Sequence, residues 1–296
     1  MTPVLVLGGT GMLGHVLWRT CRDHGMEAFA TVREEGGPAT VLDPARVISG
    51  VTVEEPDSVG RALEETGATV AVNCIGVVKQ SATTRDPVAT IRSNSLFPHQ
   101  LAASCREREV RLIQISTDCV FSGRRGGYLE EDIPDPIDLY GRSKLLGEVE
   151  NDATLTLRTS MIGRELERSN GLLEWFLTEA GGSVRGFTRA VFTGPTTPVL
   201  SRAIVELIDR HPTLEGLYHL GADPIDKYTL LCLLRDAFAL DVQIEADDTV
   251  EVDRSLDSRR FRTATGWEPP SWPEMAAELA EMASDYAGLK ESLARR

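Results

Sequence analysis

The sequence LVLGGTGMLG, residues 5–14, decides the fold of this chain, because it has the pattern of a buried strand, a tight turn and the start of a helix. Gly8, Gly11 and Gly14 have the spacing required where such a turn approaches a pyrophosphate: the first permits the turn, the second admits the phosphates, and the third packs helix on strand. Free N–H groups at the helix N-terminus would face the phosphate charge. The motif therefore predicts a dinucleotide-binding loop made by Gly8, Thr10, Gly11, Met12, Leu13 and Gly14.

Strand-like and helix-like segments alternate along the first half of the chain, which is typical of βαβ units and a parallel sheet. We expect strands at 3–8, 27–32, 69–74, 110–116 and 154–159, and helices at 12–23, 58–65, 86–108 and 139–150. Beyond residue 160 the pattern is looser, with helices expected at 171–180, 199–210, 227–240 and 273–287 and a strand at 217–220.

The predicted fold class is α/β, a Rossmann-type doubly wound parallel sheet with a smaller, interrupted C-terminal substrate-binding lobe. Residues 1–165 are expected to form the nucleotide-binding domain, with 190–222 returning to it. Residues 166–189 and 223–296 are expected to form the lobe.

Composition excludes several classes of protein. The 296 residues carry a formal net charge of −14, which opposes binding to nucleic acid and to anionic membrane surfaces. The five cysteines form no CxxC pair, and the apolar run near the start is too short for a signal peptide or a membrane span, so we expect a cytoplasmic protein without disulfides. The five histidines are scattered, and no metal site is expected.

The end of the second strand indicates the cofactor. NAD sites place an acidic residue there to bind the ribose hydroxyls. This chain has Thr31 and Val32 and then Arg33, whose guanidinium can bind a ribose 2′-phosphate through two hydrogen bonds. The sequence therefore favours NADP(H) over NAD(H), although Glu34 and Glu35 follow and Arg33 could also be an ordinary surface charge.

A tyrosine and a lysine are spaced to act together. Tyr140 and Lys144 stand four residues apart at the start of a predicted helix, so their side chains share one face. A nearby ammonium would lower the pKa of the phenol and help it to act as an acid or base. Ser116 and Thr117 end a predicted strand, where ligands bind in open α/β sheets. We expect these groups to meet, although such a pair also occurs on ordinary surface helices.

Taken together, these motifs resemble the extended short-chain dehydrogenase/reductase family, in its dTDP-4-dehydrorhamnose reductase-like branch. The resemblance is strong over about the first 165 residues. The matching stretches are the glycine loop, 73–76, Asn94 before Pro98, 116–123, 128–132, Pro136, 140–148 and 157–163.

The resemblance implies reduction of a nucleotide-activated 4-keto-6-deoxy sugar by NADPH. It implies Tyr140 as the general acid, Lys144 as the residue that binds the nicotinamide ribose and tunes the tyrosine, and Thr117 as the residue that positions the keto oxygen. It suggests a homodimer. Further expected cofactor contacts are Asn73, Cys74, Ile75, Gly76 and Asn94, and further expected substrate contacts are Val78, Lys79, Asp118, Cys119, Val120 and Glu130.

Two departures from that branch keep alternatives open. Cys119 stands where the branch usually has tyrosine, and Asp138 stands where it often has asparagine. The spacing of Thr117 and Cys119 resembles that of an epimerase/reductase in which a cysteine is an acid/base, so an epimerase is one alternative; an inert cysteine is the simpler interpretation. Dehydratases of the superfamily carry Asp-Glu after the threonine, which this chain lacks. A non-catalytic NADP-binding regulatory subunit is the remaining alternative.

The region after residue 165 holds arginines in an otherwise acidic protein. Arg189 and Arg254 lie in stretches with the composition of loops, and an arginine fork matches the oxygens of a diphosphate. We predict that these two residues bind the substrate's diphosphate; pairing with surface carboxylates is the alternative.

Overall fold

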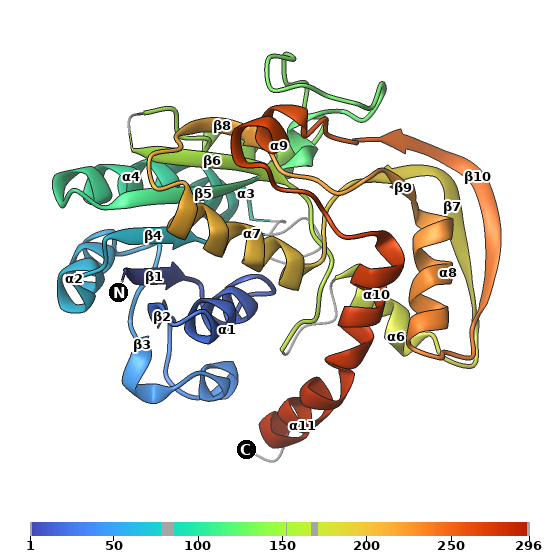
Figure 1. The fold of residues 1–296 in the computed structure, drawn as a ribbon, viewed down its shortest axis with the longest axis horizontal. Helices are drawn as coiled ribbons and strands as arrows, with labels where there is room; N and C mark the ends of the chain where they lie inside the picture. The colour runs from blue at the N-terminus through green and yellow to red at the C-terminus, as the bar shows by residue number, and fades with distance from the viewer. Residues whose placement is uncertain (1, 78–85, 152, 167–170, 295–296) are drawn as a thin grey trace.

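A computed structural model describes residues 2–77, 86–151, 153–166 and 171–294. Its centre is a seven-stranded sheet in the order β3-β2-β1-β4-β5-β6-β8, and each neighbouring pair of strands is parallel (Figure 1). This arrangement confirms the predicted Rossmann-type α/β fold. The strands are β1 (Pro3–Leu7), β2 (Glu27–Thr31), β3 (Val47–Ile48), β4 (Val70–Asn73), β5 (Arg111–Thr117), β6 (Thr154–Thr159) and β8 (Gly216–His219).

Both faces of the sheet are buried, which explains why its strands are almost continuously apolar. In β1, Val4 and Val6 belong to one apolar cluster, whereas Leu5 and Leu7 belong to another on the opposite face. The helices α1 (Gly14–Asp23) and α7 (Thr197–Arg210) contribute to the first cluster, and α2 (Asp57–Thr66) and α4 (Phe97–Glu107) contribute to the second.

The predicted helix at 86–108 contains an irregular turn. It consists of α3 (Pro87–Ile91), a π-helical turn, η4 (Arg92–Leu96), and α4. The helix α5 (Leu139–Leu146) is shorter than predicted and ends at Gly147, where a Cβ atom would lie 1.9 Å from the carbonyl oxygen of Asn94. The chain packs too closely there for any side chain.

A second sheet, which the sequence did not predict, lies in the C-terminal lobe. It has the order β10-β7-β9, formed by β7 (Ser183–Phe192), β9 (Ile225–Asp226) and β10 (Gln243–Asp253). The long strands β7 and β10 are parallel, and α8 (Lys227–Ala237) packs against them. The helix α6 (Leu172–Thr178) precedes this sheet in the chain, and together these elements lie beside the main sheet (Figure 1).

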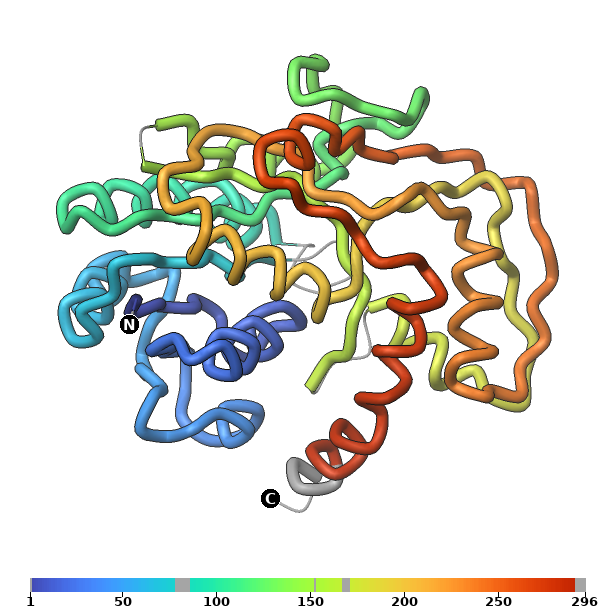
Figure 2. The backbone as a smooth tube through the Cα atoms, in the orientation of Figure 1, coloured from blue at the N-terminus to red at the C-terminus, as the bar shows by residue number. Residues whose placement is uncertain are grey.

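The C-terminal segment after β10 contacts both the main sheet and the C-terminal lobe. After β10 it crosses back to β8 and forms α9 (Arg259–Thr265), and it then returns past α8 (Figure 2). Phe261 of α9 makes an edge contact with Tyr218 of β8. The predicted helix at 273–287 is two helices, α10 (Trp272–Glu281) and α11 (Ala283–Ala294).

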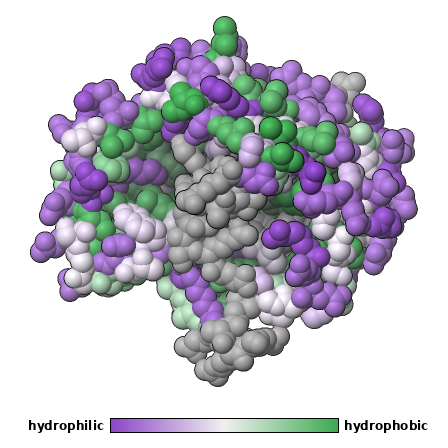
Figure 3. Space-filling model, turned by 180° about the vertical axis from the view of Figure 1, so that it is seen from behind, coloured by the Kyte–Doolittle hydropathy of each residue, from purple (hydrophilic) through white to green (hydrophobic). Residues whose placement is uncertain are grey.

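The face seen from behind is largely hydrophilic, with hydrophobic residues gathered mainly across its upper half (Figure 3). Within the described ranges, no helix has both the length and the hydropathy needed to cross a bilayer.

Candidate active site

The glycine loop joins β1 to α1 in the predicted way. Gly8 has a φ of 80°, which favours glycine, and a Cβ atom at Gly14 would lie only 2.1 Å from the carbonyl oxygen of Gly8. The third glycine therefore permits close contact between helix and strand. Thr31, at the end of β2, accepts hydrogen bonds from Gly8 N through its hydroxyl (3.2 Å) and from Gly9 N through its carbonyl (2.9 Å).

This loop fits the phosphates of a dinucleotide. No side chain caps the N-terminus of α1. The positive end of an uncapped helix attracts an anion. Gly11 at the turn is exposed, and Thr10 and Met12 beside it are partly exposed. The residues that would hold the phosphates are therefore those of the predicted loop, from Gly8 to Gly14.

The end of β4 lies against the same loop. A Cβ atom on Gly8 would meet Ile75 and the backbone of Cys74 at 3.1–3.3 Å. Asn73 is buried; its side chain donates to Gln114 (2.8 Å) and accepts from the N–H of Ile75 (3.0 Å), which shapes the turn after the strand. The structure thus brings 73–76 beside the glycine loop, whereas Val78 and Lys79 lie outside the described residues.

Asn94 connects this turn to the helix that carries the tyrosine. Its side chain forms two hydrogen bonds with the backbone of Val77, accepting at 2.9 Å and donating at 3.0 Å, and it also donates to the Ser143 hydroxyl at 3.1 Å. Ser143 lies between Tyr140 and Lys144 in α5. The π-helical turn directs Asn94 inward, where it is 1% exposed.

Thr117 and Tyr140 come together because α5 begins directly against the end of β5. Asp138 caps the helix by accepting from Gly141 N (2.8 Å), and a Cβ atom on Gly141 would lie 2.2 Å from the carbonyl oxygen of Cys119. This close approach places the side chain of Tyr140 near that of Thr117, so that the two groups interact. Thr117 Oγ1 also donates to Asp118 at 3.2 Å.

The lowering of the Tyr140 pKa that was expected from Lys144 does not dominate at this site. Burial, with Cys119 and Asp118 nearby, raises the pKa of Tyr140 above its usual value, so the phenol stays protonated at neutral pH. Lys144 Nζ instead donates to the carbonyl oxygen of Ile115 at 2.6 Å, and burial lowers its own pKa to about 8. Sharing a helical face did not bring the ammonium against the phenol.

Asp118 and Cys119 form a short 3₁₀ turn, η5 (Asp118–Val120), after the strand. Burial raises the pKa of Asp118, and burial together with the Asp118 carboxylate raises that of Cys119 to about 12. Two cations of the C-terminal lobe interact electrostatically with Asp118 and oppose the rise of its pKa. They are Lys227 and Arg254, and the latter also donates to the carbonyl oxygen of Phe121 at 2.9 Å.

Three other predicted substrate contacts lie in different surroundings. Val120 is fully buried in a small apolar cluster with Phe121, Tyr128 and Leu256. Glu130 is also buried, and its carboxylate accepts from the backbone N–H of His219 at 2.9 Å. Arg189 lies on the exposed side of β7, where it forms an ion pair with Glu251 at 2.6 Å.

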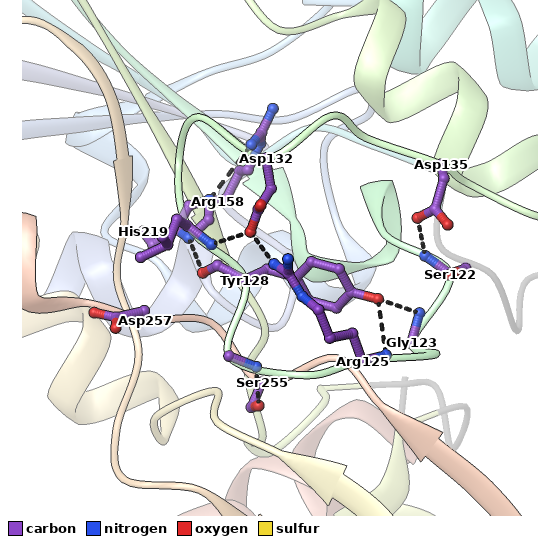
Figure 4. Close-up of polar contacts among 12 residues, drawn as sticks. Ser122, Gly123, Arg125, Tyr128, Asp132, Asp135, Arg158, His219, Ser255 and Asp257 are labelled. Carbon is purple, nitrogen blue, oxygen red and sulfur yellow. Dashed lines mark hydrogen bonds and ion pairs between the residues drawn. The ribbon is translucent and has the colours of Figure 1, made fainter.

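A buried polar network beside the end of β5 was not predicted from the sequence. Arg158 makes two 2.8 Å hydrogen bonds to Glu148, and Glu148 accepts from the Ser116 hydroxyl at 2.6 Å. His219 contacts Arg158 through Nε2 (3.4 Å) and the carbonyl oxygen of Tyr128 through Nδ1 (3.0 Å), as Figure 4 shows. Because Ser116 precedes Thr117, the network fixes the end of β5. The sequence did hold a signal for this network, because Arg158 and Glu148 are charged residues within a strand and a helix that were predicted to pack in the core.

Lys227 also escaped the sequence analysis, although the composition held a signal for it. The chain has four lysines among its 31 basic residues, so arginine is the usual surface cation and each lysine is unusual. No cluster of three or more His, Cys, Asp or Glu side chains suited to a metal ion occurs among the described residues.

Known proteins resemble this chain over most of its length. The probable low-salt glycan biosynthesis reductase Agl14 of Haloferax volcanii is 28% identical over 302 residues, covering 95% of this chain and 98% of that protein. The methionine adenosyltransferase 2 subunit beta of Bos taurus is 26% identical over 258 residues, covering 80% and 72%.

A similar solved structure is the dTDP-4-dehydrorhamnose reductase of Bacillus anthracis in complex with NADP. It is 19% identical, with a TM-score of 0.79, and the match covers 96% of this chain and all of that one, which supports the fold. The model of the RmlD substrate binding domain family matches residues 1–284. The chain therefore belongs to the RmlD substrate binding domain family.

Proposed function

We propose that this protein reduces the 4-keto group of a nucleotide-activated 6-deoxy sugar, with NADPH as the reductant. The observation that carries the proposal is the placement of Tyr140, in the first turn of α5, beside Thr117 at the end of β5, where the close approach of Gly141 to Cys119 brings the two side chains together. The printed names of a reductase relative and of a dehydrorhamnose reductase structure support the reaction class.

The glycine loop and the end of β2 support the cofactor. Gly8 to Gly14 would hold the pyrophosphate, and β2 ends at Thr31 without an acidic side chain for a ribose. Arg33, two residues on and exposed, would bind the 2′-phosphate. When bound, the nicotinamide supplies the hydride. The Bacillus anthracis structure holds NADP, in agreement with this choice.

The chain's own residues manage the oxygen and its proton. The hydroxyls of Thr117 and Tyr140 would both hydrogen-bond to the substrate's carbonyl oxygen, and Tyr140 would transfer its proton to that oxygen as negative charge develops. A phenol with a raised pKa is present as the acid at neutral pH, which suits reduction. Lys144, fixed on Ile115 and beside the turn after β4, would bind the nicotinamide ribose.

The C-terminal lobe would recognise the rest of the substrate. Lys227 and Arg254 of the lobe both interact electrostatically with Asp118, and Arg254 also donates to the carbonyl oxygen of Phe121, so cations of the lobe act on the turn after β5. Arg254 is our main candidate for binding the diphosphate, and Arg189 remains a second prediction. The division into residues 1–165 with 190–222, and 166–189 with 223–296, is part of this proposal, as are a homodimer and a cytoplasmic location.

Epimerisation by Cys119 is the less favoured alternative. A thiol with a pKa of about 12 is almost fully protonated at neutral pH and is a weak base. A second candidate function, as a subunit associated with methionine adenosyltransferase, rests on the similarity to the beta subunits. Turnover by the isolated chain distinguishes an enzyme from a non-catalytic subunit.

The test is a panel of nucleoside-diphosphate 4-keto-6-deoxy sugars offered to the purified chain with NADPH or NADH. We expect NADPH oxidation with at least one sugar, and a product changed only at the former keto carbon. Inversion at a neighbouring carbon would favour the epimerase alternative. No turnover together with binding to a methionine adenosyltransferase would favour the subunit.

A further inference from the structure

The backbone of Lys227 is held rigidly at the start of α8. The preceding residue, Asp226, pairs with Val191 in the ladder between β7 and β9. The Asp226 side chain also caps the helix, accepting from the N–H (2.9 Å) and the hydroxyl (2.6 Å) of Thr229. The backbone from which the Lys227 side chain extends is therefore held by both a strand pairing and a helix cap.

The ammonium of Lys227 is free to bind a ligand. It lies 3.8 Å from the centre of the Phe192 ring, and within the described ranges it donates no hydrogen bond and forms no ion pair. Exposed arginines of the same lobe, in contrast, form ion pairs with carboxylates: Arg185 binds Asp247 and Arg189 binds Glu251. A partly buried ammonium with three unused N–H donors suits an oxygen atom from outside the chain.

The charge of Lys227 acts on the turn that follows Thr117. Its ammonium interacts electrostatically with both Asp118 and Cys119. Burial lowers the pKa of Lys227 to about 8 and the Asp118 charge opposes that shift, so most of the ammonium is protonated at neutral pH. Asp118, which accepts a hydrogen bond from the Thr117 hydroxyl at 3.2 Å, therefore also interacts electrostatically with the ammonium of Lys227.

We propose that Lys227 and Asp118 together bind a hydroxyl group of the substrate's sugar ring, on the carbon next to the reacting carbonyl. The hydroxyl would accept a hydrogen bond from the ammonium and donate one to the carboxylate. A phosphate in this position would meet the negative Asp118, so a neutral hydroxyl is the better match. This inference rests on the proposed function and makes Lys227 a residue that determines substrate specificity.

The experiment compares the wild-type protein with Lys227→Met on two substrates. One is the 4-keto-6-deoxy sugar nucleotide that the protein reduces, and the other is its analogue without the neighbouring hydroxyl. Methionine keeps a similar length and can still contact the Phe192 ring. We expect kcat/KM for the hydroxylated sugar to fall by about 10- to 100-fold, the range for a hydrogen bond to a charged group, and kcat/KM for the analogue to change little.

Lys227→Arg should restore part of the lost activity, because it keeps the charge. Arg185→Met, which removes an exposed cation of the same lobe, should behave like wild type. NADPH binding by Lys227→Met serves as the measure of correct folding.

Three results would overturn the inference alone. They are equal losses for both sugars, no loss for either, and weaker binding of the free nucleoside diphosphate by Lys227→Met, which would assign the ammonium to a phosphate. If the wild-type protein reduces none of the sugars, the proposed function fails and the inference fails with it.

Discussion

The side chains of Thr117 and Tyr140 interact, and this contact joins the end of β5 to the first turn of α5. It depends on Gly141, where no Cβ atom could fit beside the carbonyl oxygen of Cys119. The site is therefore assembled by close packing of backbone on backbone. Two hydroxyls held in this way can meet one carbonyl oxygen without further rearrangement.

Tyr140→Phe removes the proposed proton donor and little else. We expect kcat to fall by about 10²- to 10⁴-fold, the usual contribution of general acid catalysis, with NADPH affinity retained. Tyr218→Phe is the matched control, since Tyr218 is buried in β8 and its ring contacts Phe261 of α9. Rapid reduction by Tyr140→Phe would assign the proton to another group.

Arg33→Ala tests the choice of cofactor. Loss of hydrogen bonds to a charged phosphate should weaken NADPH binding by about 10- to 100-fold, and NADH binding should be nearly unchanged. Cofactor fluorescence titration measures both affinities. The control is Arg46→Ala, which removes a nearby arginine that is paired with Glu27. Equal weakening for the two cofactors, or a wild-type preference for NADH, would contradict the assignment.

Arg254→Ala tests the substrate's diphosphate site. Arg254 lies beside Phe121 and acts on Asp118, so we expect KM for the sugar nucleotide to rise about tenfold or more while NADPH affinity stays constant. Arg189→Ala should be measured alongside, because its guanidinium already pairs with Glu251. If neither variant changes KM, the diphosphate binds elsewhere.

His219 makes the stability of the fold depend on pH. Burial and Arg158 lower its pKa from 6.5 to about 4, so in this window the unfolded chain binds a proton that the folded chain does not. The free energy of unfolding should therefore fall as the pH drops from about 6.5 toward 4, and nothing is lost above this window.

Replacing His219 measures how much this residue contributes to the pH dependence of the free energy of unfolding. In urea titrations across the window, His219→Asn should reduce the slope of unfolding free energy against pH by about 1.4 kcal/mol per unit. The buried His15, whose pKa is also lowered to about 4, contributes equally to this slope in the wild-type protein and in the variant. The variant His24→Asn, which replaces an exposed histidine, provides the control. An unchanged slope in His219→Asn would show that His219 is not neutral in the fold.

The sequence predicted the main sheet because its signals are local. Apolar runs such as 4–7 and the glycine turn that follows determine each strand and its helix without reference to distant residues. The strand β10 gave no such signal, since most of its residues are exposed and five of them are acidic, and its partner β7 lies some 60 positions earlier in the register. Pairing of two polar, distant segments cannot be read from either alone.

Part of the candidate site, likewise, could be predicted from the sequence, and part could not. Thr117, Tyr140 and Lys144 stand in motifs that the sequence displays, and the sequence placed them on the correct elements. The direction of the Lys144 side chain and the pKa of Tyr140 depend on burial and on Cys119 and Asp118, which only the folded structure supplies. Lys227 reaches the site through the lobe, whose sheet was not predicted.

The most direct test of the account is a single-turnover measurement with the purified chain, NADPH and a nucleoside-diphosphate 4-keto-6-deoxy sugar. The account predicts rapid loss of NADPH absorbance, with formation of the corresponding alcohol, and a rate at least about 100-fold lower for Tyr140→Phe at full cofactor occupancy. No NADPH oxidation with any such sugar, or equal rates for the two proteins, would contradict it.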